Sequence, residues 1–251
     1  MAGSASRERL AACLYAGCLG RPSTAQELSG AVTALDGGLE PCDLALRLFQ
    51  SPEFLSTSRF VALLYPALLQ RAPEYLTWEI YRNAIVTGRV TREQMVQNFL
   101  SSVEHAIQFR TRSDEEFIGM LYGALLVRRP IPQEIEECRR ILQSATSRAA
   151  VVERLLDRAE LTNGPAHYIT AFLLYATLLQ RESAANERVL RAEQVREGTP
   201  LRRVIADILN SREFAGLAGL DGDQAVDPAK PPLALRALHY VRSKYRVRAG
   251  P

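Results

Sequence analysis

One eight-residue motif recurs four times along this chain of 251 residues. Each copy has the form Leu-Tyr-x-x-Leu-Leu-x-Arg, except that a cysteine replaces one of the paired leucines in the first copy. The motif tyrosines are Tyr15, Tyr65, Tyr122 and Tyr175, and the arginines six residues later are Arg21, Arg71, Arg128 and Arg181. A motif that returns at intervals of 50 to 57 residues indicates one supersecondary unit copied along the chain.

The composition favours a helical protein. Hydrophobic residues make up 47% and charged residues 24% of the chain, which is ordinary for a globular domain. Leucine, alanine, arginine and glutamate dominate, and runs of β-branched residues are absent. Apolar runs stay short of the roughly 20 residues that cross a bilayer. We therefore predict an all-α fold without a transmembrane helix or signal peptide, located in the cytoplasm or exported without a leader.

The second unit shows the three helices that we predict for every unit. The first spans 58–70 and ends before Pro73, because proline cannot continue a helix. The second ends at Gly88, since a left-handed residue closes a helix and glycine adopts that conformation without a Cβ clash. The third begins at a capping box formed by Thr91 and Gln94.

Extra residues fall only between the units, so the connections are predicted to be surface loops. Each unit is expected to bury its apolar face against its neighbour in an array of four three-helix units. The predicted ranges are 1–56, 57–112, 113–164 and 165–214 for the units, 215–232 for a linker and 233–251 for a basic C-terminal segment.

The motif, the glycine after the second helix and the stretch Phe49–Phe54, which reads Phe-Gln-Ser-Pro-Glu-Phe, together resemble the DUF4214 family. That family is a short helical repeat of many bacterial proteins and is distantly similar to the phycobilisome linker domain. The resemblance covers about Arg9–Phe214 and is strongest in the first, second and fourth units. It implies an accessory role in surface-layer, polysaccharide or envelope contexts, and it implies no catalytic residue for this chain.

The recurring motif residues admit a ligand-binding and a structural interpretation. The tyrosines would offer four equivalent contacts to a repetitive ligand, but each lies in an apolar stripe and is expected to fill a helix crossing instead. The arginines follow helix ends, where positive charge favours the terminal carbonyl groups. We also predict bidentate ion pairs between each arginine and a carboxylate late in the same unit. The predicted pairs are Arg21 with Glu53, Arg128 with Glu160 and Arg181 with Glu213; the second unit has Val103 at that place, followed by Glu104, and is expected to lack the pair.

The C-terminal segment has a composition of its own. From Leu233 onward it holds several basic residues and no acidic residue, although the net charge of the chain is only +3. So small a net charge does not by itself indicate nucleic acid. We predict that this segment docks to a protein partner or to an anionic membrane surface. Its candidate residues are Arg236, Tyr240, Arg242, Lys244, Tyr245, Arg246 and Arg248.

Sequence motifs of catalysis are absent. The histidines have no second ligand at helical spacing, and the chain contains no phosphate loop, dinucleotide glycine pattern or nucleophile elbow. We therefore predict a non-enzymatic interaction or scaffold module, with no cofactor and no metal, that binds another protein or a bacterial surface polysaccharide. The alternatives are a linker-like structural subunit tethered by the basic C-terminal segment, and a nucleic-acid binder.

Overall fold

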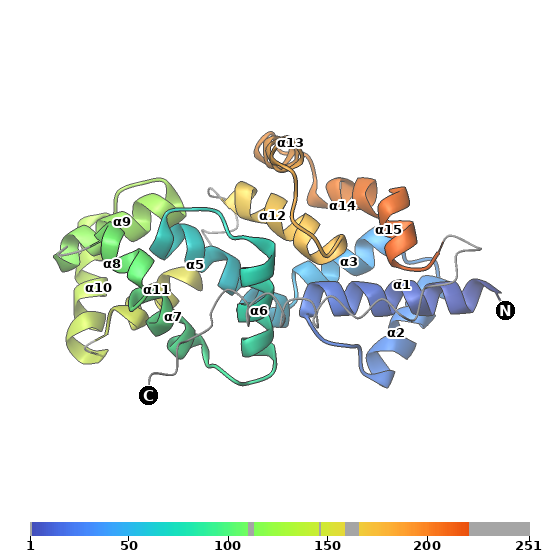
Figure 1. Cartoon of the computed structure of the whole chain (residues 1–251), viewed down its shortest axis with the longest axis horizontal. Coiled ribbons are helices and arrows are strands. Elements are labelled where there is room, and N and C mark those ends of the chain that lie inside the picture. The colour runs from blue at the N-terminus through green and yellow to red at the C-terminus, as the bar shows by residue number, and fades with distance from the viewer. Residues whose placement is uncertain (1, 110–112, 146, 159–165, 221–251) are drawn as a thin grey trace, which may run out of the picture.

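The computed structural model describes residues 2–109, 113–145, 147–158 and 166–220 (Figure 1). Within these ranges the chain forms helices and no strand, which confirms the predicted all-α class. No helix in the described part is both long and apolar enough to cross a membrane. The elements are α1 (Ala2–Leu19), α2 (Ala25–Asp36), α3 (Pro41–Phe49), α4 (Pro52–Phe54), the π-helix η1 (Leu55–Arg59), α5 (Phe60–Leu69), α6 (Tyr75–Val86), α7 (Arg92–Leu100), α8 (Val103–Phe109), α9 (Asp114–Leu126), α10 (Pro132–Ala145), α11 (Arg148–Leu156), α12 (Ala166–Leu178), α13 (Ala185–Arg196), α14 (Leu201–Leu209) and α15 (Arg212–Leu217).

Each motif segment folds into three helices in the predicted order. The motif lies on α1, α5, α9 and α12, and two further helices follow each of them. The structure adds a short fourth helix, α4, α8 or α15, after the third helix of the first, second and fourth units. This helix forms because a serine hydroxyl accepts a hydrogen bond from the backbone N–H three residues later. The three caps are Ser51 to Phe54 at 3.2 Å, Ser102 to His105 at 3.1 Å and Ser211 to Phe214 at 3.2 Å.

Left-handed residues end the first two helices of the units. Those after the motif helices are Gly20, Gln70, Val127 and Gln180, with φ of 71°, 50°, 52° and 51°. Gly88, which was predicted to close the second helix of its unit, is also left-handed, and so are its counterparts Gly38 and Gly198 in the first and fourth units. In the third unit Ala145 is the last residue of α10, and residue 146 lies outside the described part.

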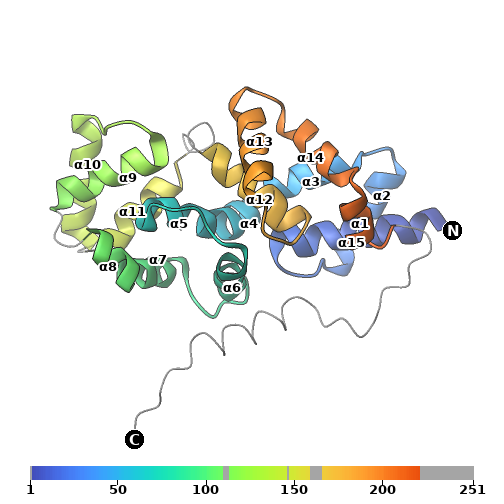
Figure 2. The same cartoon turned by 45° about the horizontal axis from the view of Figure 1, so that its top comes forward.

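The units pair in a nested order that the array prediction missed. Helices α1 and α3 of the first unit pack against α12 and α14 of the fourth, and α5 and α7 of the second pack against α9 and α11 of the third. We call the first pair the first lobe, which combines the blue and orange helices of Figure 1, and the second pair the second lobe. Figure 2 shows the same two groups from another side. The second lobe is therefore inserted into the first along the chain.

The lobes are joined by continuous helix, so the prediction of a loop between the first and second units was wrong. Helix α4 runs through the π turn η1 into α5 without a break. The turn holds two contacts of Ser58: its carbonyl accepts the indole N–H of Trp78 at 2.9 Å, and its hydroxyl donates to the carbonyl of Cys18 at 2.7 Å. π turns interrupt the ordinary hydrogen-bond ladder of a helix, and this one is used to fasten α1 and α6 to the junction.

Trp78 lies fully buried where three units meet. Its ring packs edge-on against Phe172 of α12, with centroids 5.4 Å apart, and the guanidinium of Arg82 lies 4.6 Å from its centroid. Arg82 in turn donates to the carbonyl of Gly17 in α1 at 2.8 Å. Gly17 also marks the close crossing of α1 and α12, because a Cβ added there would lie 2.0 Å from the carbonyl oxygen of Thr177.

Candidate functional site

The motif tyrosines are mostly buried. Tyr65, Tyr122 and Tyr175 are 1%, 0% and 5% exposed, whereas Tyr15 is half-buried. Burial raises the pKa of Tyr122 to about 12. The ring of Tyr65 packs edge-on against Phe99, with centroids 5.2 Å apart. Three of the four rings therefore offer no face to a ligand, which supports the packing interpretation.

In the second, third and fourth units the motif arginine turns back toward its own tyrosine. The guanidinium carbon of Arg71 lies 5.1 Å from the centroid of the Tyr65 ring, and the third and fourth units repeat this contact at 5.2 Å. The left-handed residue just before each arginine reverses the chain and makes this approach possible. In all four units the arginine Nη1 also donates to the carbonyl of the following residue, at 2.9 to 3.3 Å.

The predicted late carboxylates meet the arginine in the two units where both partners are described. Arg21 donates to Glu53 through Nε at 2.6 Å and Nη2 at 2.7 Å. Arg181 binds Glu213 through the same two nitrogens. Glu160, which we predicted as the partner of the third arginine, lies outside the described residues.

The second unit has this ion pair as well, which corrects our prediction. Arg71 donates to Glu104 through Nε at 2.6 Å and Nη2 at 3.2 Å. The serine that caps α8 is Ser102, one place later than the register of the other units predicts. The single extra residue moves the carboxylate from the position of Val103 to that of Glu104.

A second carboxylate in the motif was missed by the sequence analysis. Arg21 donates from Nη1 and Nη2 to the two oxygens of Glu27, at 2.9 and 2.8 Å. Glu134 and Glu187 receive the same bidentate pair in the third and fourth units. The signal is present in the sequence, because a glutamate stands six residues after the arginine in three of the four copies.

This second glutamate also caps its own helix. The backbone N–H groups of Thr24, Ile131 and Ala184 donate to Glu27, Glu134 and Glu187 at 2.7 to 2.9 Å. The arginine contact, helped by this N–H, holds the pKa of Glu27 and of Glu134 at about 2. The motif arginine therefore fastens the end of the first helix of a unit to the start of the second. Through the late carboxylate it also fastens the first helix to the short fourth helix.

The second unit departs from this pattern. Thr77 stands where the other units have the glutamate, and its hydroxyl accepts a hydrogen bond from Tyr65 at 3.0 Å. Glu74 lies 3.5 Å from the Nη1 of Arg71. In the third unit Arg158 adds a second guanidinium, which donates to Glu134 at 2.6 Å.

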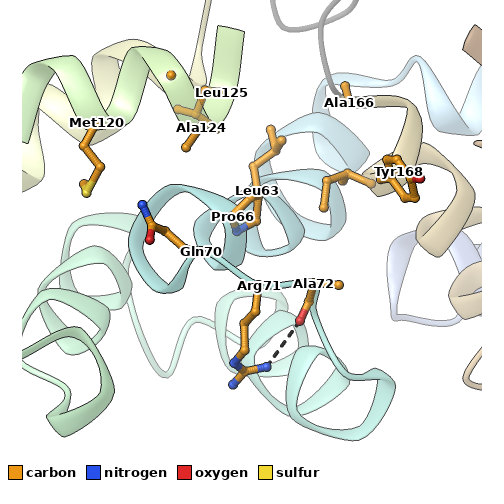
Figure 3. Close-up of a pocket in the computed structure, with 12 residues that line it drawn as sticks. Leu63, Pro66, Gln70, Arg71, Ala72, Met120, Ala124, Leu125, Ala166 and Tyr168 are labelled. Atoms are coloured by element: carbon orange, nitrogen blue, oxygen red, sulfur yellow. Dashed lines mark hydrogen bonds between the residues drawn. The ribbon is translucent and has the colours of Figure 1, made fainter. Parts of the chain in front are cut away.

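A cleft of about 640 Å³ lies between α5, α9 and α12, beside the second motif (Figure 3). Its walls are mainly aliphatic: α5 supplies Leu63 and Pro66, α9 supplies Met120 and Ala124, and α12 supplies Ile169. This volume is within the usual range of ligand sites. Since α5 and α9 belong to the second lobe and α12 to the first, both lobes build the cleft.

Few polar groups border the cleft in the described structure. Gln70 and Tyr168 lie at its rim, and the tyrosine is 50% exposed. Arg71 contributes its stem, whereas its guanidinium points away from α9 toward the carbonyl of Ala72 (Figure 3). The cleft is thus suited to an apolar group with a few hydrogen-bonding positions at its edge.

The α9 side of the cleft, which Gly123 lines, leaves room for added atoms. Gly119 and Gly123 lie one turn apart on α9, and a Cβ added to either would have no atom of the described structure within 4 Å. Glycine inside a helix costs about 1 kcal/mol relative to alanine. The equivalent position of Gly119 on α12 is Phe172, three residues before its motif tyrosine, and Trp78 of α6 covers it. A face that is covered in the first lobe is therefore bare in the second.

The remaining sequence candidates contribute little to a site in the described structure. All the candidate docking residues from Arg236 to Arg248 lie outside it. Glu40, Cys42 and Asp43 bring three potential metal ligands together, but Arg202 already binds both carboxylates at 2.7 and 2.6 Å.

Comparison with known proteins finds one family that is similar to part of the chain. No curated protein and no solved structure matched it. The model of the family described as "Domain of unknown function (DUF4214)" matches residues 55–109, which span η1 to α8 and include the second motif with its ion pair. Residues 55–109 are therefore similar to that family.

Proposed function

We propose that this chain is a non-catalytic interaction module that binds an apolar segment of a protein partner in the cleft between α5, α9 and α12. The observation that carries the proposal is the cleft, with its aliphatic walls and its volume of about 640 Å³. Its α9 wall admits close approach of a helix, since Gly123 presents no side chain there and Gly119 lies one turn away. Binding of an amphipathic helix in such a groove is a common mode of peptide recognition.

The lining favours a protein segment over a polysaccharide. A sugar carries many hydroxyl groups, and these would lose hydrogen bonds to water against walls such as Leu63, Met120 and Ile169. The repeated tyrosines do not offer a sugar-stacking surface either, because three of the four rings are buried.

The charges favour a protein over a nucleic acid. Phosphate binding needs basic groups that are available to replace counterions. The described motif guanidinium groups instead form ion pairs with glutamates of the same chain, as Arg21 does with Glu27 and Glu53. Because these guanidinium groups are used to hold the fold together, the apolar cleft is the better candidate for the binding surface.

The proposal can be tested by placing a charge in the cleft. Gly123→Glu adds a carboxylate to its wall at a position where the Cβ meets no described atom within 4 Å, and Gly30→Glu on α2 is a matched control, since its Cβ also has nothing within 4 Å. A photoreactive amino acid at Tyr168 would first identify the partner in an extract of the native cells. We expect Gly123→Glu to weaken binding of the purified partner at least tenfold and Gly30→Glu to leave it unchanged. Equal binding by both variants, or adducts with glycan instead of protein, would overturn the proposal.

A further inference from the structure

The bare face of α9 suggests what occupies the cleft when no partner is bound. In the first lobe, the equivalent face of α12 is covered by α6 through the contact of Trp78 with Phe172. In the second lobe, a Cβ added at Gly119 or Gly123 would meet no atom of the described structure within 4 Å, so no described helix covers this position. A helix that covers this face has to come from outside the described residues.

The basic C-terminal segment has the pattern of such a helix. Ala234, Leu238, Val241 and Tyr245 follow one another at intervals of four, three and four residues, which places them on one face at helical spacing. His239 and Ser243 fall on the opposite face. The segment can therefore present an apolar stripe to a groove and keep polar groups toward water.

The chain between the body and this segment is long enough to reach the cleft. Residues 221–232 separate Leu220 from Leu233 and span up to about 40 Å when extended. Leu220 follows α15, which packs on α14, and α14 packs on α12. Helix α12 is about 20 Å long, and the residues that line the cleft are at its N-terminal end.

The charges are also compatible with this occupant. Arginines and acidic residues balance within residues 1–220, whereas Leu233–Arg248 carries five basic residues and no acidic one. Helix α9 begins with Asp114, Glu115 and Glu116, one turn before Met120 of the cleft. Arginines of the body share two of these carboxylates, so the acidic turn attracts a basic segment only moderately.

We propose that Leu233–Arg248 of the same chain docks in the cleft as an amphipathic helix, with Leu238 and Val241 against its apolar walls, and must leave before a protein partner enters. This inference rests on the function proposed above for the cleft, and it adds regulation by an internal competitor. An internal occupant competes at a high effective concentration, because the linker holds it near the site.

Cross-linking in the full-length protein tests where the segment binds. A benzophenone amino acid would replace Tyr168 at the cleft or, as a control, Leu190 on α13, which is 53% exposed. Digestion before aspartates releases 227–251 as one peptide, because Asp227 is the last acidic residue. We expect an intramolecular adduct of this peptide from position 168, at least tenfold above that from position 190.

Paired substitutions in the segment give the control. L238N/V241N on the apolar face should lower the adduct at least tenfold, whereas H239N/S243N on the opposite face should retain most of it. An adduct only between two copies of the chain would overturn the intramolecular assignment. The assignment would also be wrong if no adduct formed and the full-length chain bound vesicles rich in phosphatidylserine, because the segment would then bind a membrane surface instead.

Binding of anilinonaphthalene sulfonate, an anionic fluorescent dye whose apolar rings enter hydrophobic clefts, separates this inference from the proposed function. L238N/V241N should raise dye binding several-fold, and adding Gly123→Trp, which fills the cleft, should abolish the increase, whereas Gly30→Trp should not. If Gly123→Trp lowers dye binding equally with and without L238N/V241N, the cleft binds apolar ligands but the segment is not its occupant. If Gly123→Trp has no effect in either background, the proposed function fails as well.

Discussion

Gly17 has no room for a methyl group, so Gly17→Ala should destabilise the first lobe. The added Cβ would lie 2.0 Å from the carbonyl oxygen of Thr177 and 3.2 Å from its carbonyl carbon. These atoms belong to the backbone of α12 and cannot rotate away, so the two helices would have to separate. Overpacking of this kind typically costs about 1–3 kcal/mol.

Two further effects set the size of the change. The carbonyl of Gly17 accepts a hydrogen bond from the buried guanidinium of Arg82 at 2.8 Å. A hydrogen bond from a charged donor contributes about 1.5–3 kcal/mol, and part of this is lost when α1 moves away from Arg82. Alanine is the better helix former by about 1 kcal/mol, which opposes the loss. The expected decrease in the free energy of unfolding is therefore about 2–4 kcal/mol.

Equilibrium unfolding in urea, followed by tryptophan fluorescence, measures this decrease. Trp78 is the only tryptophan and lies fully buried beside Arg82, so its emission reports the junction directly. Gly30→Ala on α2 is the matched control, because its Cβ would meet nothing within 4 Å, and it should raise the free energy of unfolding by about 0.5–1 kcal/mol. A Gly17→Ala protein at least as stable as the wild type would refute the reasoning about the crossing.

Three other outcomes are expected. A double-mutant cycle of Arg21→Met and Glu53→Gln should give a coupling energy of about 1 kcal/mol by thermal unfolding, and a value near zero would show that the ion pair is only a surface contact. The folded-state pKa of Glu27 is about 2, below its ordinary value of 4.5, so its ion pair stabilises the fold above pH 4.5 and this contribution is lost as the pH falls toward 2. Glu27→Gln should therefore make the free energy of unfolding depend less on pH between 4.5 and 2. A fragment of residues 55–158 should show cooperative helical unfolding by circular dichroism, because the second and third units pack together, whereas a fragment of residues 1–54 should not, because its partners α12 and α14 are missing.

Local features of the fold could be predicted because their causes are local. The capping box of Thr91 and Gln94 and the left-handed Gly88 depend on a few neighbouring residues, and both appear where the sequence places them. The pairing of Arg21 with Glu53 followed from spacing that recurs between copies. The nested order of the units could not be predicted, because four similar apolar faces are compatible with several pairings. The cleft was missed because its openness depends on which distant helices lie beside Gly123 of α9, and local sequence patterns do not reveal such long-range packing.

The unbroken helix from Pro52 to Leu69 is a rigid connection between the two lobes. One residue inserted or deleted along it would turn everything beyond by about 100° and shift it by about 1.5 Å. Such a turn would carry the indole of Trp78 away from the ring of Phe172 and swing α5 and α9 away from α12. A looped connection would absorb such length changes, whereas this helix does not, so the spacing between Pro52 and Tyr65 is set by the angle at which the two halves must face each other.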